Sequence, residues 1–196
     1  MTNTKTLDDV TTLADAAAAG KKGNRPSNKA VVNALVQAEK AAKQQRLVYP
    51  LQSLLGNWRL CFTAPRKAHL KGGMAVGRGF YVPQIAKAQI SFSQVPTSDG
   101  SEVEIGNSLQ VSSLLLQLTG PARYLGKKNL LAFDFTYMQL SLFGRAVYSG
   151  EFRSGKTKNF SQQAIAKLPF FAFFLVTEDL IAARGRGGGI ALWVKE

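Results

Sequence analysis

One segment of the sequence has the residue spacing of a phosphate-binding loop. Residues 150–157 read GEFRSGKT, which satisfies the pattern G-x-x-x-x-G-K-[ST]. In nucleotide-binding proteins this loop follows a buried parallel strand and opens a long helix, whose amino terminus holds the phosphate. Here the segment lies between stretches with the pattern of antiparallel strands, and Pro169 would end a following helix after about two turns. We therefore interpret residues 150–157 as a basic hairpin or loop.

The other reactive side chains do not form a convincing catalytic site. His69 is the only histidine and has no acidic neighbour to orient it, so we do not expect it to act as a base. Cys61 is the only cysteine, which excludes an internal disulfide and a His/Cys zinc cluster. Asp134 has no second carboxylate at a spacing that pairs with it. We predict a protein that is not an enzyme, with no metal site and no obligatory cofactor.

Positive charge is the strongest chemical signal in the sequence. Lys and Arg number 25 against 12 Asp and Glu, so the formal net charge is +13, and every charge between Ala41 and Ser98 is positive. Each cation close to an anionic membrane leaflet contributes on the order of 1 kcal/mol, so a few are enough for reversible docking. The cations that we expect to face such a surface are Arg66, Lys67, Lys71, Arg78 and Lys87.

Two predicted helices precede a region rich in strands. Residues 7–18 are rich in Ala with apolar residues at helical spacing, and residues 27–45 carry an apolar stripe with Ser27 as the candidate N-cap. Between them, residues 20–26 form a basic linker with Gly and Pro. We therefore divide the chain into an N-terminal helix with its linker, residues 1–26, and a domain over residues 27–196.

After Pro50 the hydrophobic residues alternate with polar ones, which is the pattern of β-strands. Clusters of Gly, Asn, Asp and Pro separate the short runs, and no long helical pattern lies between them. Strands that follow one another so closely form an antiparallel sheet, which closes into a barrel or folds into a sandwich. We predict a mainly β protein, an antiparallel β-barrel of about eight strands behind an N-terminal helical segment.

Two motifs resemble the plastid lipid-associated proteins, also called fibrillins, of chloroplasts and cyanobacteria. Residues 54–63, LLGNWRLCFT, resemble the opening strand L-x-G-x-W-x-L-x-Y-T of that family, with Phe62 in place of tyrosine. Residues 178–194 resemble its closing motif E-D-L-R-I-S-R-G-x-x-G-x-x-F-V, with Ile181 in place of the first arginine. Residues 106–108, Gly-Asn-Ser, resemble an internal element of the family, so the similarity spans about residues 28–196.

The resemblance implies a lipocalin-like barrel that binds hydrophobic molecules such as lipids, carotenoids or quinones and associates with photosynthetic membranes. It also implies that Trp58 on the first strand packs under Arg184 near the last, a cation-π contact that closes the barrel. The alternating aromatic strands within this frame provide the residues that we expect near the ligand: Phe133, Phe135, Tyr137, Phe171 and Phe173.

Two other classes of partner remain open. An acidic pigment-protein complex would fit the same basic surface if side chains filled the barrel interior. Nucleic acid is the least favoured partner, because it rests on the net charge and on one RGRGGG segment at residues 184–189, which a tight connection into the last strand explains. Asp8 and Asp9 argue against a signal or transit peptide. We expect a cytoplasmic protein peripheral to the thylakoid membrane, or a plastid one if it is a processed plant chain.

Overall fold

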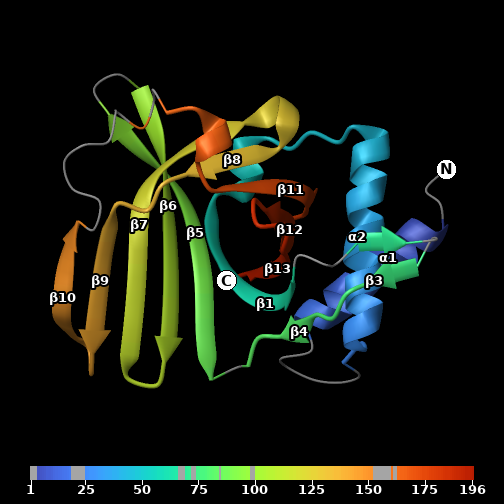
Figure 1. Ribbon diagram of the computed structural model, residues 1–196, viewed down its shortest axis with the longest axis horizontal. Coiled ribbons are helices and arrows are strands. Elements are labelled where there is room, and N and C mark those ends of the chain that lie inside the picture. Colours follow the sequence, from blue (N-terminus) through green and yellow to red (C-terminus); the bar gives the residue numbers. More distant parts are fainter. Residues whose placement is uncertain are drawn as a thin grey trace.

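A computed structural model describes residues 4–18, 25–65, 69–71, 74–83, 85–97, 100–151, 160 and 163–196. Its helices α1 (Thr4–Ala18) and α2 (Asn28–Gln45) precede the sheet and pack against each other (Figure 1). Ser27 caps α2, because its hydroxyl accepts a hydrogen bond from the backbone N–H of Ala30 at 3.2 Å. The helix predicted over residues 27–45 is thereby confirmed. No helix in the described ranges is long and apolar enough to cross a bilayer.

Strands of 2 to 12 residues account for most of the rest of the described chain. They are β1 (Gly56–Ala64), β2 (His69–Lys71), β3 (Met74–Val76), β4 (Phe80–Tyr81), β5 (Ala86–Thr97), β6 (Gly100–Val111), β7 (Leu114–Leu125), β8 (Leu130–Phe133), β9 (Tyr137–Leu142), β10 (Arg145–Glu151), β11 (Phe170–Val176), β12 (Leu180–Gly185) and β13 (Ile190–Lys195). Single 3₁₀ turns occur at η1 (Leu51–Leu54), η2 (Gly126–Lys128) and η4 (Ile165–Lys167).

Eight of the strands close into an antiparallel barrel. Around the barrel they follow the order β7-β6-β5-β1-β13-β12-β11-β8, and β8 pairs again with β7. Apart from the strands inserted between β1 and β5 and between β8 and β11, each barrel strand pairs with the next one along the chain, which is the up-and-down arrangement. The structure confirms the prediction of a mainly β protein, with a helical segment before a barrel of about eight strands.

β7 changes its partner halfway along its length. Residues 114–119 pair with β9, whereas residues 122–125 pair with β8. Gly120 lies at this change, where an added Cβ would collide with the carbonyl oxygen of Asp134. As a result β9 and β10 leave the barrel and extend the sheet beyond it (Figure 1, left). We call β9 and β10, together with the halves of β6 and β7 that continue them, the sheet extension.

The buried hydrophobic residues form two cores on opposite sides of the strands. One core fills the barrel interior and includes Trp58, Phe92 and Ile105. The other lies between the helices and the outer faces of β1, β11, β12 and β13, and it includes Leu13 of α1 and Leu35 of α2. α1 is therefore packed onto the barrel domain. Because both faces of these strands are covered, successive residues such as Leu192 and Trp193 are both buried.

Candidate functional site

The face of the sheet that lines the barrel interior continues onto the sheet extension. The register places Ile90 opposite Asn107 and Asn107 opposite Leu118, so the three side chains lie on one face. Ile90 belongs to the barrel interior, which identifies this as the inner face. Following the same face outward gives a continuous set of apolar residues, which we call the apolar sheet face: Leu109, Val111, Leu114, Leu116, Leu118, Met138, Leu140, Leu142 and Tyr148.

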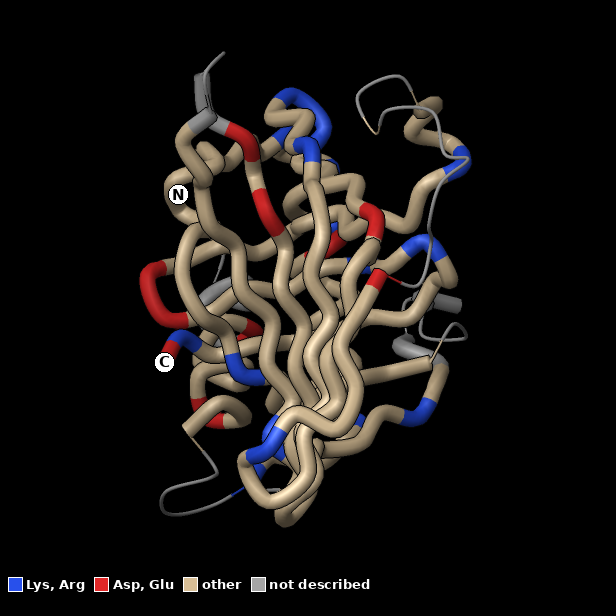
Figure 2. The backbone as a smooth tube through the Cα atoms, turned by 90° about the vertical axis from the view of Figure 1, so that its left-hand side faces the viewer, with Lys and Arg blue, Asp and Glu red and all other residues tan. Residues whose placement is uncertain are grey.

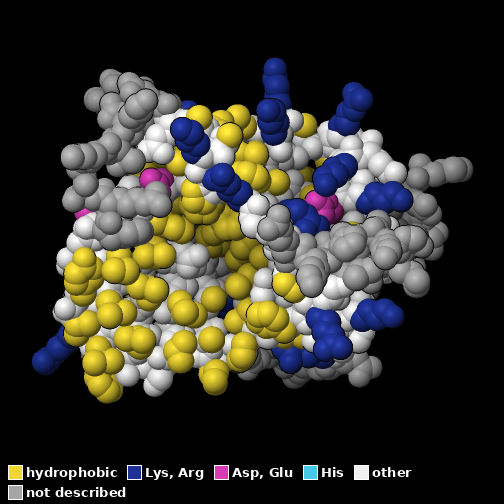
Figure 3. All heavy atoms as spheres, in the orientation of Figure 1, with side chains coloured by type: hydrophobic (Ala, Val, Ile, Leu, Met, Phe, Trp, Pro, Cys, Tyr) yellow, Lys and Arg dark blue, Asp and Glu magenta, His cyan; other side chains and the backbone are white. Residues whose placement is uncertain are grey.

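The apolar sheet face is uncovered in the part of the chain that the structure describes. Leu109, Val111, Leu114, Leu142 and Tyr148 are between 40% and 47% exposed. Figure 3 shows apolar side chains gathered over the sheet extension around a hollow near the barrel. Residues 105–122 carry no formal charge, and Figure 2 shows that charged residues lie mainly toward the ends of these strands. Contiguous exposed apolar surface of this kind is typical of a binding site.

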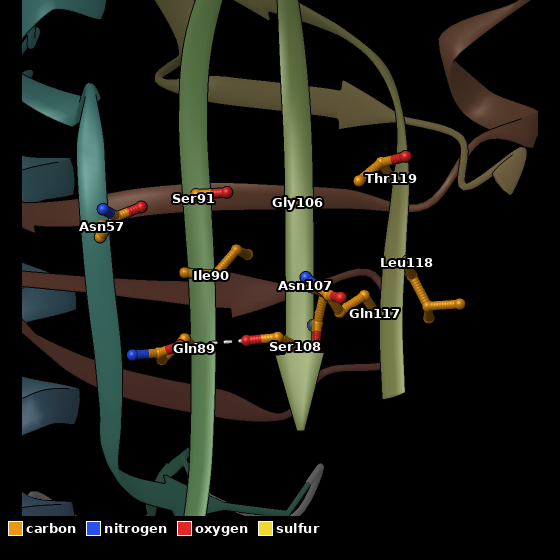
Figure 4. A pocket seen from close by; sticks show the side chains of 10 residues that line it. All are labelled: Asn57, Gln89, Ile90, Ser91, Gly106, Asn107, Ser108, Gln117, Leu118 and Thr119. Carbon is orange, nitrogen blue, oxygen red and sulfur yellow. Dashed lines mark hydrogen bonds between the residues drawn. The ribbon is translucent and has the colours of Figure 1, made fainter. Parts of the chain in front are cut away.

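The opposite face of the same strands is polar. Gln89, Ser108, Gln117 and Gln139 lie side by side across four strands, and the Ser108 hydroxyl donates a hydrogen bond to the Gln89 side chain at 3.1 Å. A shallow hollow of about 210 Å³ opens on this face at Gly106 (Figure 4). The side chains that border it carry amides, hydroxyls and aliphatic groups but no charge. The sheet extension is therefore amphipathic, with a water-facing side and an apolar side.

Four of the five aromatic residues expected near the ligand meet in the barrel interior. The ring centroids of Phe133 and Phe171 are 5.0 Å apart, those of Phe133 and Phe135 are 5.1 Å apart, and those of Phe171 and Phe173 are 6.3 Å apart. Phe133 and Phe173 are only 5% and 3% exposed. At this end of the barrel the rings pack on one another, with offset and edge contacts that stabilise aromatic clusters.

Tyr137 does not join this cluster. It lies opposite Thr119 and Glu151, on the polar face, and is 38% exposed. The alternation seen in the sequence breaks because residues 134–136 are not in a strand and lead β9 out of the barrel. The leucines of the apolar sheet face were not expected as site residues. The absence of charge over residues 105–122 was the available signal for them.

The prediction that Trp58 packs under Arg184 is wrong. Trp58 lies in the barrel interior, donates its indole N–H to the carbonyl of Leu54 at 2.7 Å, and has the Lys195 ammonium 5.1 Å from its ring centroid. Arg184 pairs with Ile190 at the start of β13, whereas Trp58 pairs with Lys195 at the end of that strand. β13 separates the two strands that carry Trp58 and Arg184, and the two side chains point to opposite faces.

Arg184 instead joins the barrel to α2. Its Nε lies 2.9 Å from one carboxylate oxygen of Glu39 and its Nη2 lies 2.5 Å from the other. Lys43 donates a further hydrogen bond to Glu39 at 2.9 Å. Burial raises the pKa of Glu39, but the hydrogen bonds and charges of Arg184 and Lys43 outweigh it, so this pKa lies below its ordinary value of 4.5. The Glu39 carboxylate thus compensates the positive charge of the partly buried Arg184 guanidinium.

The cations expected at an anionic surface are only partly described. Arg66 and Lys67 lie outside the described residues, and for Lys71 only the backbone, in β2, is described. Arg78 precedes β4 and is exposed, and Lys87 is exposed on the polar face of β5. Other cations lie along α2 and at the nearby end of the barrel, as Figure 3 shows.

The other motifs and reactive side chains that the sequence analysis considered lie in strands, turns or the core where the structure describes them. Gly150 and Glu151 end β10, and the rest of the GEFRSGKT segment lies outside the described residues. Arg184 and Gly185 end β12, and residues 186–189 form the tight connection into β13. The buried Cys61 thiol donates a hydrogen bond to the carbonyl of Leu192 at 3.3 Å, and burial raises its pKa to about 11. Among the described residues no group of three or more His, Cys, Asp and Glu could hold a metal ion.

The apolar sheet face thus combines a continuous apolar surface, a link to the barrel interior and a polar reverse side. Comparison of the chain with protein-family models, with curated proteins and with solved structures gives no match.

Proposed function

We propose that the protein binds hydrophobic small molecules without catalysing a reaction, and that it does so while docked on a membrane surface. The observation that carries this proposal is the uninterrupted passage from the buried aromatic interior to the uncovered apolar sheet face. Because the rings fill the interior near Phe133 and Phe171, the ligand lies on the apolar sheet face and reaches only the edge of the aromatic cluster. A lipid, a carotenoid or a quinone has the long apolar body that such a surface accepts.

Asn107 gives this surface one polar anchor. It lies between Ile90 and Leu118 on the inner face and is half-buried. The structure records no hydrogen bond of its side chain to any described residue. Its amide can donate to a carbonyl oxygen and accept from a hydroxyl, which are the polar groups of quinones and many lipids. We propose that Asn107 orients the polar end of the ligand.

Docking is supported by the end of the sheet at which both β5 and β10 begin. We call this end the docking edge and define it as Ile85, Lys87, Phe143 and Arg145. Ile85 and Phe143 are 80% and 79% exposed, which is extreme for large apolar side chains. Lys87 and Arg145 are exposed near them in the chain. Apolar side chains that enter the lipid, flanked by cations that meet anionic headgroups, are the two components of peripheral membrane binding.

The proposed ligand surface is tested with Leu116→Asp, a charged substitution on the apolar sheet face, and with Gln117→Asp, its neighbour on the polar face. Binding of β-carotene and of a decyl-substituted benzoquinone is measured by quenching of tryptophan fluorescence. Burial of one leucine contributes about 1.5–3 kcal/mol, so Leu116→Asp is expected to weaken binding by about tenfold or more, while Gln117→Asp leaves it unchanged. Equal losses in both variants, or no binding by the unaltered protein at micromolar concentration, would refute the proposal.

The packed barrel interior also supports a second function. In this alternative the barrel is structural, and its basic surface holds an acidic partner such as a pigment-protein complex. Salt-sensitive co-purification of such a partner, with no small molecule in an organic extract, would favour it. The resemblance to fibrillins supports the first function, and with it a place at the thylakoid membrane, over this alternative.

A further inference from the structure

A groove of about 360 Å³ lies between the carboxyl end of α2 and the turn that joins β7 to β8. Its cations come from both sides: Lys43 and Arg46 from the end of α2, and Lys127 and Lys128 from η2. Among the described residues that line it, Glu39 is the single acidic one, and Arg184 and Lys43 already contact this carboxylate. The groove therefore has a clear excess of positive charge. We call it the basic groove.

Three of these cations have no counter-ion among the residues that the structure describes. No ion pair joins Arg46, Lys127 or Lys128 to any acidic residue in the described ranges, and all three side chains are exposed. Like charges that share a groove repel each other unless an anion lies between them. Their arrangement favours an anion in the groove.

The two sides of the basic groove are tied together by Asn129. Its side-chain amide donates a hydrogen bond to the carbonyl of Leu47 at 2.6 Å and accepts one from the N–H of Tyr49 at 2.9 Å. The hydroxyl of Tyr124 donates to the carbonyl of Tyr49 at 2.8 Å. These bonds join the segment after α2 to the β7–β8 turn, so the backbone segments that carry the cations are held side by side.

Backbone strain also occurs at the basic groove. Arg46 and Asn129 both line it, and their φ angles of 51° and 49° lie in the left-handed region. Glycine is the usual residue where a helix ends in this conformation, because a Cβ is disfavoured there. A charged side chain at the end of α2 is thus present at a cost in stability, which is a pattern found at functional sites.

Apolar surface adjoins the cations. Leu47 and Val48 line the same groove and are 40% and 61% exposed. A free inorganic anion gains nothing from such neighbours, whereas a molecule with an apolar part beside its charged group gains by covering them.

We propose that the basic groove binds the phosphate group of an amphiphilic molecule. The phosphate lies between Arg46 and the Lys127–Lys128 pair, and the apolar part of the molecule covers Leu47 and Val48. A lipid headgroup and a soluble phosphate ester share this chemistry. The carboxyl end of α2 lies on the side of the molecule opposite to the β9–β10 turn of the docking edge (Figure 1). The phosphate site is therefore separate from the docking edge and does not depend on the proposed function.

Calorimetric titration tests the proposal with two probes, inorganic phosphate and dihexanoyl phosphatidic acid. The double variant Lys127→Gln/Lys128→Gln removes two groove cations, and Lys29→Gln/Lys167→Gln removes the same charge from two exposed lysines that belong neither to the groove nor to the docking edge. At about 1 kcal/mol per cation, the groove variant is expected to bind dihexanoyl phosphatidic acid about 30-fold more weakly, with the control unchanged. Equal weakening in both variants, or no binding of either probe by the unaltered protein, would overturn the site.

Flotation with vesicles distinguishes the two sources of phosphate. If the source is a lipid headgroup, adding phosphatidic acid to phosphatidylcholine vesicles increases binding of the unaltered protein but not of the groove variant. If it is a soluble ester, the groove variant loses the calorimetric signal and keeps its vesicle binding. Arg46→Gly provides a further check, because it is expected to raise the melting temperature while it weakens phosphate binding. A variant that binds phosphate as well as the unaltered protein would contradict the role of Arg46.

Discussion

The substitution Phe143→Asn is expected to stabilise the fold and to weaken membrane binding. Phe143 and Gly144 are the central residues of the β9–β10 turn, with φ angles of 49° and 76°. Hairpin turns with positive φ at both central positions prefer Asn-Gly, because Asn tolerates the left-handed conformation better than an aromatic residue. Phe143 is 79% exposed, so its ring contributes little packing to the folded state. We expect Phe143→Asn to raise the free energy of unfolding by about 0.5–1 kcal/mol.

The effect on membrane binding has the opposite sign. Complete burial of a phenylalanine side chain contributes about 1.5–3 kcal/mol, and most of this ring is available for burial in lipid. Its loss is therefore expected to cost about 2 kcal/mol of membrane affinity, which is roughly a thirtyfold weaker partition. Phe143→Leu is the matched control, since leucine keeps the apolar surface and the strain of the turn.

The two effects are measured separately, by urea unfolding and by flotation with vesicles that contain anionic lipid. Phe143→Leu is expected to bind vesicles nearly as well as the unaltered protein and to show no gain in stability. The reasoning fails if Phe143→Asn floats with vesicles as efficiently as the unaltered protein does. It also fails if that variant is less stable, because the ring would then contribute to packing that the exposed turn does not provide.

Three further predictions concern the interior. Asn129→Ala is expected to lower the free energy of unfolding by about 1–3 kcal/mol, because it leaves partly buried backbone groups of the segment after α2 without partners. Urea denaturation measures this loss, and an unchanged free energy of unfolding would contradict it. Because the pKa of Glu39 lies below its ordinary value of 4.5, its contribution to stability is present above about pH 4.5 and declines as the pH falls further. Glu39→Gln is expected to cost about 2 kcal/mol at neutral pH and to flatten the acid limb of a melting-temperature profile, whereas an unchanged acid limb would exclude this role. With its pKa raised to about 11, the buried Cys61 thiol is expected to react with Ellman's reagent at pH 8 only after urea unfolds the chain, and rapid reaction of the native protein would refute its burial.

The barrel was predictable because burial imposes a simple period on the strands. Trp58 and Leu60 alternate with polar neighbours, and their strand does lie in the barrel wall. The helix after Ser27 was predictable in the same way from its apolar stripe. The alternation of apolar and polar residues does not predict which face a residue takes after a break in the strand. Residues 134–136 are not in a strand, so Tyr137 lies on the face opposite to the one expected, and a β-bulge between Leu60 and Phe62 has a similar effect in β1.

The candidate sites were less predictable because they depend on which strands become neighbours. The basic groove joins the segment after α2 to a turn far away in sequence: the hydrogen bond from Tyr49 to Asn129 spans 80 residues. The positive segment at residues 41–98 contains only half of its cations, since Lys127 and Lys128 lie beyond it. The partner of Arg184 likewise depends on α2, which supplies Glu39 on the outside of the barrel.

From the change of partner along β7 we expect the molecule to unfold in two units, the barrel and the β9–β10 hairpin. The ring of hydrogen bonds that completes the barrel runs through β8 and does not involve β9 or β10. The β9–β10 hairpin can therefore separate from β7 while the barrel remains folded, so its amides should exchange with solvent through a local opening that costs less than global unfolding. Ligand or lipid on the apolar sheet face would hold the hairpin in place, and the slowing of that exchange would report occupancy in a protein whose barrel does not otherwise change.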